Sequence, residues 1–279
     1  MSMLARLIHI DRRWIFLCIA LAVVVPFLTH LQFLQGTPTP ATVAVYDYIQ
    51  KLPPGKPVML IFDYGPAGMP EIHPMAMALI RQCFMRHVPV IAMTLHPQGP
   101  PMIEMAFAKV TPDFQVRYGK DYVNLGFKPG WQSVILGIGS GFATTYPTDT
   151  RGTPLSQLPI MRNVKGYDDI GLAVDLATGS APGAWIAFAH QRFHLTLALG
   201  ITAVMATDNY VYLQTGQIVG LINGMRGAAE YEHLVNHPDV GALGMSSQSV
   251  AHLVLILFVI LGNVGYFAGR AHARRTREG

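Results

Sequence analysis

Four polar residues lie at or just beyond the ends of apolar runs that are typical of buried β-strands. They are Asp63, His96, Asp175 and Asp208. Ligands of parallel α/β sheets bind beyond the carboxyl ends of the strands, so these four side chains form one candidate catalytic rim. Carboxylates beside an imidazole could act as general acid and base, or bind a divalent metal. The alternative is structural, because Asp and His often start loops by bonding to local backbone.

A second group of metal-binding residue types follows the first apolar run. Glu71 and His73 are the candidate ligands for a divalent metal, and no other cofactor is expected. His73 also lies among Met69, Met75 and Met77, and thioether and imidazole groups suit Cu(I). The alternative is that these methionines fill the buried face of a helix.

Nucleotide binding and nucleophilic catalysis have little support in the sequence. The segment Gly137-Ile-Gly-Ser-Gly141 lacks the G-x-G-x-x-G spacing and falls inside a helical pattern, so close helix packing explains it better. Ser140 is not in a G-x-S-x-G turn, and Cys83 has the setting of a small buried hydrophobe.

The elements that position these residues alternate between strand and helix. Apolar strand patterns cover 57–62, 88–95, 122–125, 170–176, 195–206 and 217–222. Helical spacing covers 41–52, 75–86, 101–110, 131–142, 182–193 and 227–235. Continuous apolar strands are buried on both faces, which is typical of parallel sheets. The pattern predicts an α/β, Rossmann-like three-layer sandwich with a mostly parallel sheet.

Two further apolar stretches are long enough to cross a bilayer. The chain is 51% hydrophobic and only 13% charged, and residues 14–34 and 249–268 concentrate the apolar residues. Arginines lie outside both stretches and predict that both termini are cytoplasmic. For the first stretch, the alternative is a cleaved signal peptide.

This topology predicts six segments in an inner (cytoplasmic) membrane protein. They are a cytoplasmic flank (1–13), a first transmembrane helix (14–34), a linker (35–40), a periplasmic or extracellular α/β domain (41–248), a second transmembrane helix (249–268) and a basic cytoplasmic tail (269–279). Residues 36–248 carry 13 Lys and Arg against 14 Asp and Glu, so the pI of 9.1 comes from the flanks. The domain therefore lacks the basic surface that nucleic-acid binding requires.

Small residues near the end of the second apolar stretch predict helix association. They are Gly262, Asn263, Gly265 and Gly269. Gly265 and Gly269 have the G-x-x-x-G spacing that lets helices approach closely, and an Asn can bond across helices. The alternative is that small residues only ease the exit of the chain from the bilayer.

Three segments carry a resemblance to other sequences. Residues 217–232, rich in Gln and Gly, precede the last apolar stretch, and 62–66 and 119–126 accompany them. Together they resemble a family of uncharacterised bacterial membrane-anchored α/β proteins. The resemblance implies a membrane anchor and transfers no activity and no site.

The sequence predicts a non-enzymatic interaction or structural subunit of a membrane assembly, with the lipid bilayer and either other subunits or a second copy as partners. The alternative is a hydrolase, or a receptor for a small ligand or metal, that uses the Asp and His rim. A part of a transporter or channel is a third possibility, since two spans require further subunits.

Overall fold

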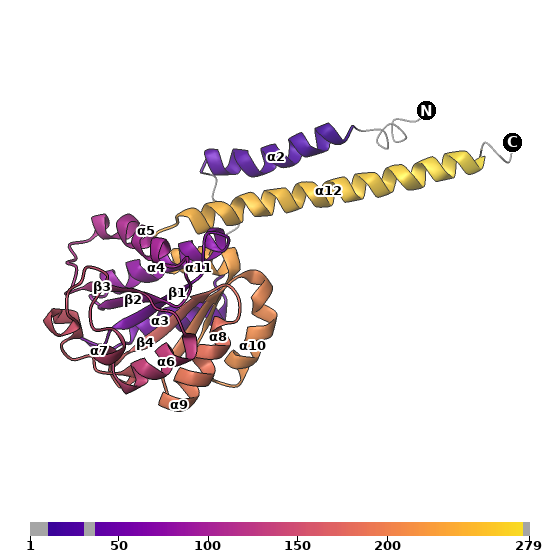
Figure 1. Ribbon diagram of the computed structural model, residues 1–279. Coiled ribbons are helices and arrows are strands. Elements are labelled where there is room, and N and C mark those ends of the chain that lie inside the picture. The colour runs from indigo at the N-terminus through magenta and orange to yellow at the C-terminus, as the bar shows by residue number, and fades with distance from the viewer. Residues whose placement is uncertain (1–10, 31–36, 276–279) are drawn as a thin grey trace. The chain divides into compact units, whose positions relative to one another are not determined.

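The computed structural model describes residues 11–30 and 37–275, with the backbone alone for 268, 269 and 271–275. Two compact units are present (Figure 1). Residues 36–242 form an α/β domain, and the helices at the two ends of the chain belong to the second unit.

The α/β domain is built on one six-stranded sheet in which every neighbouring pair is parallel. Its strands are β1 (Val58–Asp63), β2 (Val90–Thr94), β3 (Tyr122–Phe127), β4 (Leu172–Ala177), β5 (Leu197–Ile201) and β6 (Leu221–Asn223). The strand order is β3-β2-β1-β4-β5-β6, which is the Rossmann-like order. The α/β, Rossmann-like prediction is confirmed. The central strands β1, β2, β4 and β5 are buried along their whole length, as their continuous apolar sequences require.

Helices cover both faces of the sheet. The first face is covered by α3 (Pro40–Gln50), α4 (Met69–Met85), α5 (Pro100–Val110) and α11 (Gly224–Leu234). The second face is covered by α6 (Trp131–Ser140), α7 (Phe142–Thr145), α8 (Ala181–Trp185) and the segment 146–170. Short 3-10 turns complete the domain at η2 (Thr111–Asp113), η3 (Leu155–Gln157), η4 (Pro159–Met161), η5 (Tyr167–Asp169) and η7 (Ala203–Met205).

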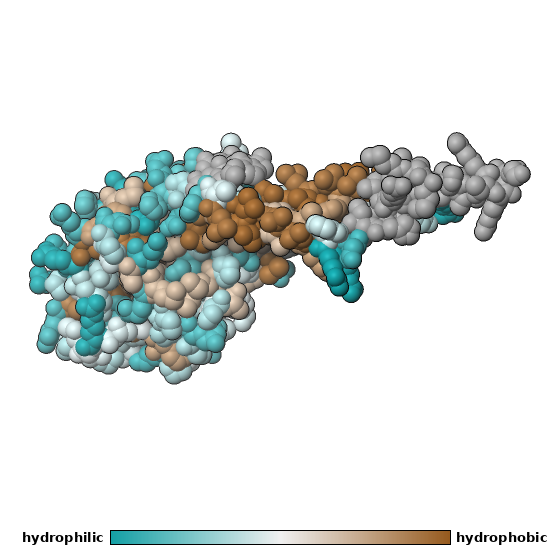
Figure 2. Space-filling view, turned by 90° about the horizontal axis from the view of Figure 1, so that it is seen from above, coloured by the Kyte–Doolittle hydropathy of each residue, from teal (hydrophilic) through white to brown (hydrophobic). Residues whose placement is uncertain are grey.

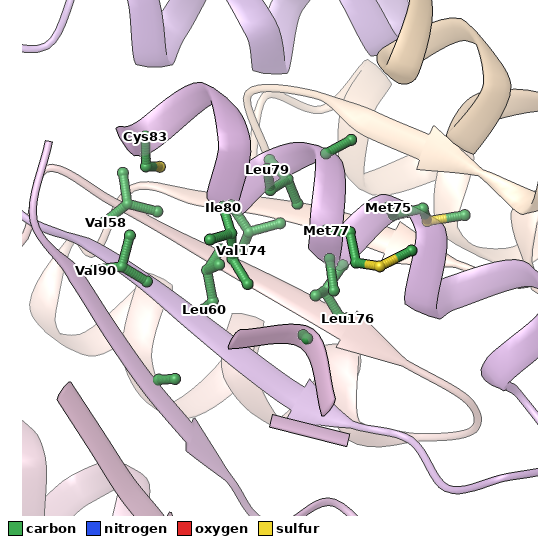
Figure 3. Packing of buried hydrophobic residues seen from close by; sticks show 14 of the residues in the cluster. Val58, Leu60, Met75, Met77, Leu79, Ile80, Cys83, Val90, Val174 and Leu176 are labelled. Atoms are coloured by element: carbon green, nitrogen blue, oxygen red, sulfur yellow. The ribbon is translucent and has the colours of Figure 1, made fainter. Parts of the chain in front are cut away.

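The methionines of α4 belong to the hydrophobic core. Met75 and Met77 of α4 belong to the same core cluster as Leu60 and Leu176 of the sheet (Figure 3). Met75 is fully buried and Met77 is 6% exposed. The structural alternative therefore holds for these two methionines of the Met and His patch. They are core residues, and their flexible side chains fill irregular space in the core.

Several predicted elements differ in extent. The strand expected over 217–222 is confined to β6 at Leu221–Asn223. The strand expected over 195–206 ends at Ile201, and η7 and α10 (Ala206–Gln214) follow it. The β5 pairing stops at Ile201 because its partner in β4, Ala177, is the last residue of that strand. The helix expected over 182–193 changes at Ile186 into a π-helical turn, η6 (Ile186–His190), and continues as α9 (Gln191–Phe193).

The helix at the beginning of the chain is shorter than expected. Within the described residues, α2 (Arg12–Leu28) has 17 residues, or about 26 Å, and does not qualify as a membrane span. The predicted first span over 14–34 is therefore not supported, and residues 31–34 lie outside the described part. Pro26 lacks the N–H that would bond the preceding turn, and His30, at φ 51°, leaves the helical conformation.

The helix at the end of the chain is long and apolar. α12 (Val240–Arg275) contains a 28-residue segment, Val240–Phe267, that is long and apolar enough to cross a membrane, and it is the one such helix in the described residues. The segment would measure about 42 Å. Hydrophobic residues cover the described part of the terminal helices almost continuously, whereas the visible face of the domain is mixed (Figure 2). The predicted second span over 249–268 thus lies within a helix that begins nine residues earlier.

Candidate functional site

The centre of the sheet holds two buried carboxyl groups on neighbouring strands. Asp63 is the last residue of β1, and Asp175 pairs with Ile61 in the β1–β4 register. Residues alternate between the faces of a strand, so both side chains lie on the second face, with Met59, Ile61 and Ala173. Asp63 is 2% exposed and Asp175 is fully buried.

Asp63 is held by three donors from other parts of the fold. Its Oδ1 accepts from the Leu95 N–H at 2.6 Å and from the Thr94 hydroxyl at 3.4 Å. Its Oδ2 accepts from the Trp185 indole N–H at 3.2 Å. Burial raises the pKa of Asp63 above the ordinary value for a carboxyl group, although these hydrogen bonds partly oppose the shift. Asp63 therefore joins the loop after β2 to α8.

Asp175 has no such donors. Neither of its carboxyl oxygens has a hydrogen-bond partner in the described part of the chain. Burial, and then the charge of Asp63, raise the pKa of Asp175 well above its ordinary value. Burial without a donor therefore favours the protonated form of Asp175, because an isolated buried carboxylate is costly.

Tyr146 lies close enough to this carboxyl pair for the charge of Asp63 to affect its pKa. Burial, and then the charge of Asp63, raise the pKa of the Tyr146 phenol. Its hydroxyl group is buried and unbonded among the described residues. Tyr146 and Trp185 were not expected from the sequence, because they lie 83 and 122 residues from Asp63 and belong to no motif.

His96 lies in the loop that follows β2. It is half-buried, and its Nδ1 accepts from the Gln98 N–H at 3.1 Å. A Cβ atom at Gly65 would lie 3.2 Å from the imidazole, so the loops after β1 and β2 pack closely here. His96 thus makes a local hydrogen bond to the backbone, as the structural alternative predicts.

Asp208 lies away from the carboxyl pair. It is exposed in the first turn of α10, and it lines a hollow of about 400 Å³ together with the loop after β4, the start of α8, Met205 and other residues of α10. The four residues of the predicted rim therefore occupy different surroundings: Asp63 and Asp175 lie together, His96 contributes its backbone beside Asp63, and Asp208 lies apart.

The two candidate metal ligands bond to separate partners. Glu71 accepts from the Ala203 N–H at 2.9 Å, which joins α4 to the loop after β5. His73 is 6% exposed, and its Nδ1 lies 2.8 Å from the Tyr64 hydroxyl. Burial lowers the pKa of His73 to about 4. Among the residues that the structure describes, no three His, Cys, Asp or Glu side chains converge as metal ligands.

The crevice where Rossmann-like sheets usually bind dinucleotides is filled. That crevice lies between the carboxyl ends of β1 and β4. A Cβ atom at Gly68, after β1, would lie 2.3 Å from the Thr178 methyl group, after β4. The first turn of α4 also carries Pro70, which has no N–H, and the negative Glu71. Both features disfavour a phosphate at this helix end.

No protein-family model, no curated protein and no solved structure matches this chain. Its function must therefore be argued from its own residues and geometry.

Proposed function

We propose that the chain is a membrane-anchored, non-enzymatic interaction or structural subunit of a membrane protein assembly. In this proposal two helices span the inner membrane, both termini are cytoplasmic, and the α/β domain is periplasmic or extracellular. The observation that carries the proposal is α12, whose apolar segment Val240–Phe267 starts directly after the last helix of the domain.

Side-chain exposure on the terminal helices supports the anchor. On α12, Leu253, Ile256 and Val259 are each more than half exposed, and on α2 the same holds for Phe16 and Leu28. Water would not favour such surfaces, whereas lipid does. The proposed first span would include α2.

Charged and aromatic residues support the orientation. Arg12 and Arg13 begin α2, and Arg270 follows the apolar segment of α12. The Arg270 guanidinium lies 3.4 Å from the Tyr266 hydroxyl, an arrangement suited to the bilayer interface. Basic residues at both outer ends favour cytoplasmic termini.

The bonding of the polar residues supports a non-enzymatic role. Asp63 is bonded to the Leu95 N–H and the Trp185 indole, and Asp175 is enclosed. A hydrolase that used the whole rim would need Asp63, His96, Asp175 and Asp208 to converge on one cavity. Their separate surroundings favour the interaction subunit over this alternative.

The polar residue within the apolar segment supports association in the membrane. Asn263 is exposed, and its Nδ2 donates to the Val259 carbonyl of its own helix at 2.8 Å. Its exposed amide oxygen would gain a donor from a partner helix in lipid, and the exposed Gly262 beside it would permit close approach. Gly265 is buried, and Gly269 is described by its backbone alone.

Topology mapping tests the anchor. In a background that lacks Cys18 and Cys83, Asp168→Cys places one thiol on the exposed surface of the domain. We expect an impermeant maleimide to label it in intact cells with the outer membrane opened. Labelling that appears only after the inner membrane is permeabilised would contradict the proposed topology.

Sizing of the detergent-solubilised chain tests the assembly. We expect an oligomer or a copurifying membrane subunit, and we expect Asn263→Leu to weaken it. Val264→Leu, an exposed apolar change on the next position, is the matched control. A monomer without any copurifying subunit would argue against the proposal.

A further inference from the structure

A hollow at the carboxyl edge of the sheet lies between the loop after β4, the start of α8 and α10. In Figure 1, α8 and α10 lie next to each other. The Gly179 N–H contacts the Met205 sulfur at 3.1 Å and so joins the loops after β4 and β5 beside the hollow. Its volume of about 400 Å³ falls in the range of small-molecule sites. The crevice between β1 and β4 is filled, whereas this hollow is open at the ligand-binding edge.

The polar groups around the hollow are hydrogen-bond acceptors. Asp208 is exposed, and its carboxylate has no hydrogen bond or ion pair within the described part of the chain. Asn209 is 7% exposed, and its Nδ2 donates to the Met205 carbonyl at 2.9 Å, which leaves its Oδ1 available as an acceptor. No Lys, Arg or His lines the hollow. The negative carboxylate therefore disfavours anions and favours a positively charged donor.

The remaining walls are apolar or aromatic. Pro182, Met205 and Tyr212 line the hollow. An aliphatic chain can lie against the proline and the thioether, and the tyrosine ring can attract a cation through its face. Asp208 by itself has an ordinary position in the first turn of a helix, where a negative charge is stabilised. The features of a ligand site come from the nearly buried amide of Asn209 and from the apolar walls of the hollow.

We infer that this hollow binds a small organic cation, with a primary ammonium group at Asp208 and Asn209 and a short aliphatic body against Met205 and Tyr212. This inference stands apart from the proposed membrane role. It concerns only the α/β domain and holds whatever the orientation of the chain.

Calorimetric titration of the full chain in detergent with putrescine tests the inference. We expect saturable binding of putrescine, and none of the neutral 1,4-butanediol or the anionic succinate at the same concentrations. Asp208→Asn should weaken binding about fivefold, the effect of one exposed ion pair. Asp168→Asn removes an exposed carboxylate elsewhere and should leave binding unchanged.

A second variant separates the hollow from a general charge effect. A Cβ atom at Gly183 would meet nothing within 4 Å, so this position faces open space. Gly183→Leu should therefore preserve thermal stability, fill the hollow and weaken putrescine binding at least tenfold. The inference is wrong if putrescine shows no saturable binding, if either pocket variant binds it as the wild type does, or if the diol or succinate binds equally well.

Discussion

Glu230 and Glu232 lie two residues apart on α11 and hold the two ends of the α/β domain. Glu230 accepts from the Thr39 N–H at 2.9 Å and from the Thr39 hydroxyl at 2.8 Å, just before α3 begins. Glu232 accepts from the N–H groups of Gly241 and Ala242, at 2.9 and 2.8 Å, in the first turn of α12. Residues two apart on a helix point to different sides, so one helix can reach both places.

Replacing Glu232 should destabilise the domain. Glu232 is 2% exposed and also accepts from the Asp239 N–H, so Glu232→Ala removes the side-chain acceptor of three backbone N–H groups. We expect a loss of about 3 kcal/mol in the free energy of unfolding, and about 1 kcal/mol for Glu232→Gln, which retains acceptor capacity. Denaturant unfolding checks both values. Equal stability of Glu232→Ala and the exposed-site control Asp168→Asn would contradict the capping role.

The buried carboxyl of Asp175 should make stability fall as pH rises. Its pKa is raised in the folded state, so its contribution is fully present below the unfolded value near 3.8 and is lost as pH rises through the folded value. Each unit of difference corresponds to about 1.4 kcal/mol. Unfolding free energies of wild type and Asp175→Asn, measured from pH 4 to 9, should diverge in favour of the variant at high pH. A constant difference would show that Asp175 does not titrate in this way.

The buried pair of Tyr64 and His73 should act in the opposite direction. The pKa of His73 is lowered from 6.5 to about 4, so the stability associated with its neutral form is lost as pH falls from 6.5 toward 4. The loss should approach about 3 kcal/mol. The double variant Tyr64→Phe, His73→Leu removes both polar partners and should not show this acid loss. An unchanged acid profile in the double variant would assign the loss to other groups.

The contact between Gly68 and Thr178 should allow no added methyl group. Gly68→Ala would place a Cβ atom 2.3 Å from the stiff, β-branched Thr178, and overpacking of this kind costs about 1–3 kcal/mol. Thr178→Ala removes the opposing methyl group and should restore most of the loss in the double variant. Thermal unfolding of the two single variants and the double variant gives the coupling. Additive effects would mean that the two loops do not meet at these residues.

The strands and the fold class could be predicted from local sequence. A run such as Val58–Phe62 is apolar at every position, and a short run of this kind bounded by turn residues is typical of a strand buried on both faces. The alternation of these runs with helical patterns then leaves the parallel α/β arrangement. The apolar segment that ends at Phe267 could also be recognised in the sequence, because the length of a hydrophobic run is a local property.

The surroundings of the polar residues depended on partners far along the chain. Asp175 precedes the end of β4 by two residues and is buried, because the register with β1 places Ala177 beside Asp63. Trp185, which donates to Asp63, comes from a helix 122 residues away. Helix α12 begins at Val240 because Glu232 caps its first turn. Pairing register, burial and capping join distant segments, and no pattern within a short window encodes them, so only the tertiary structure could separate the buried acids from the exposed Asp208.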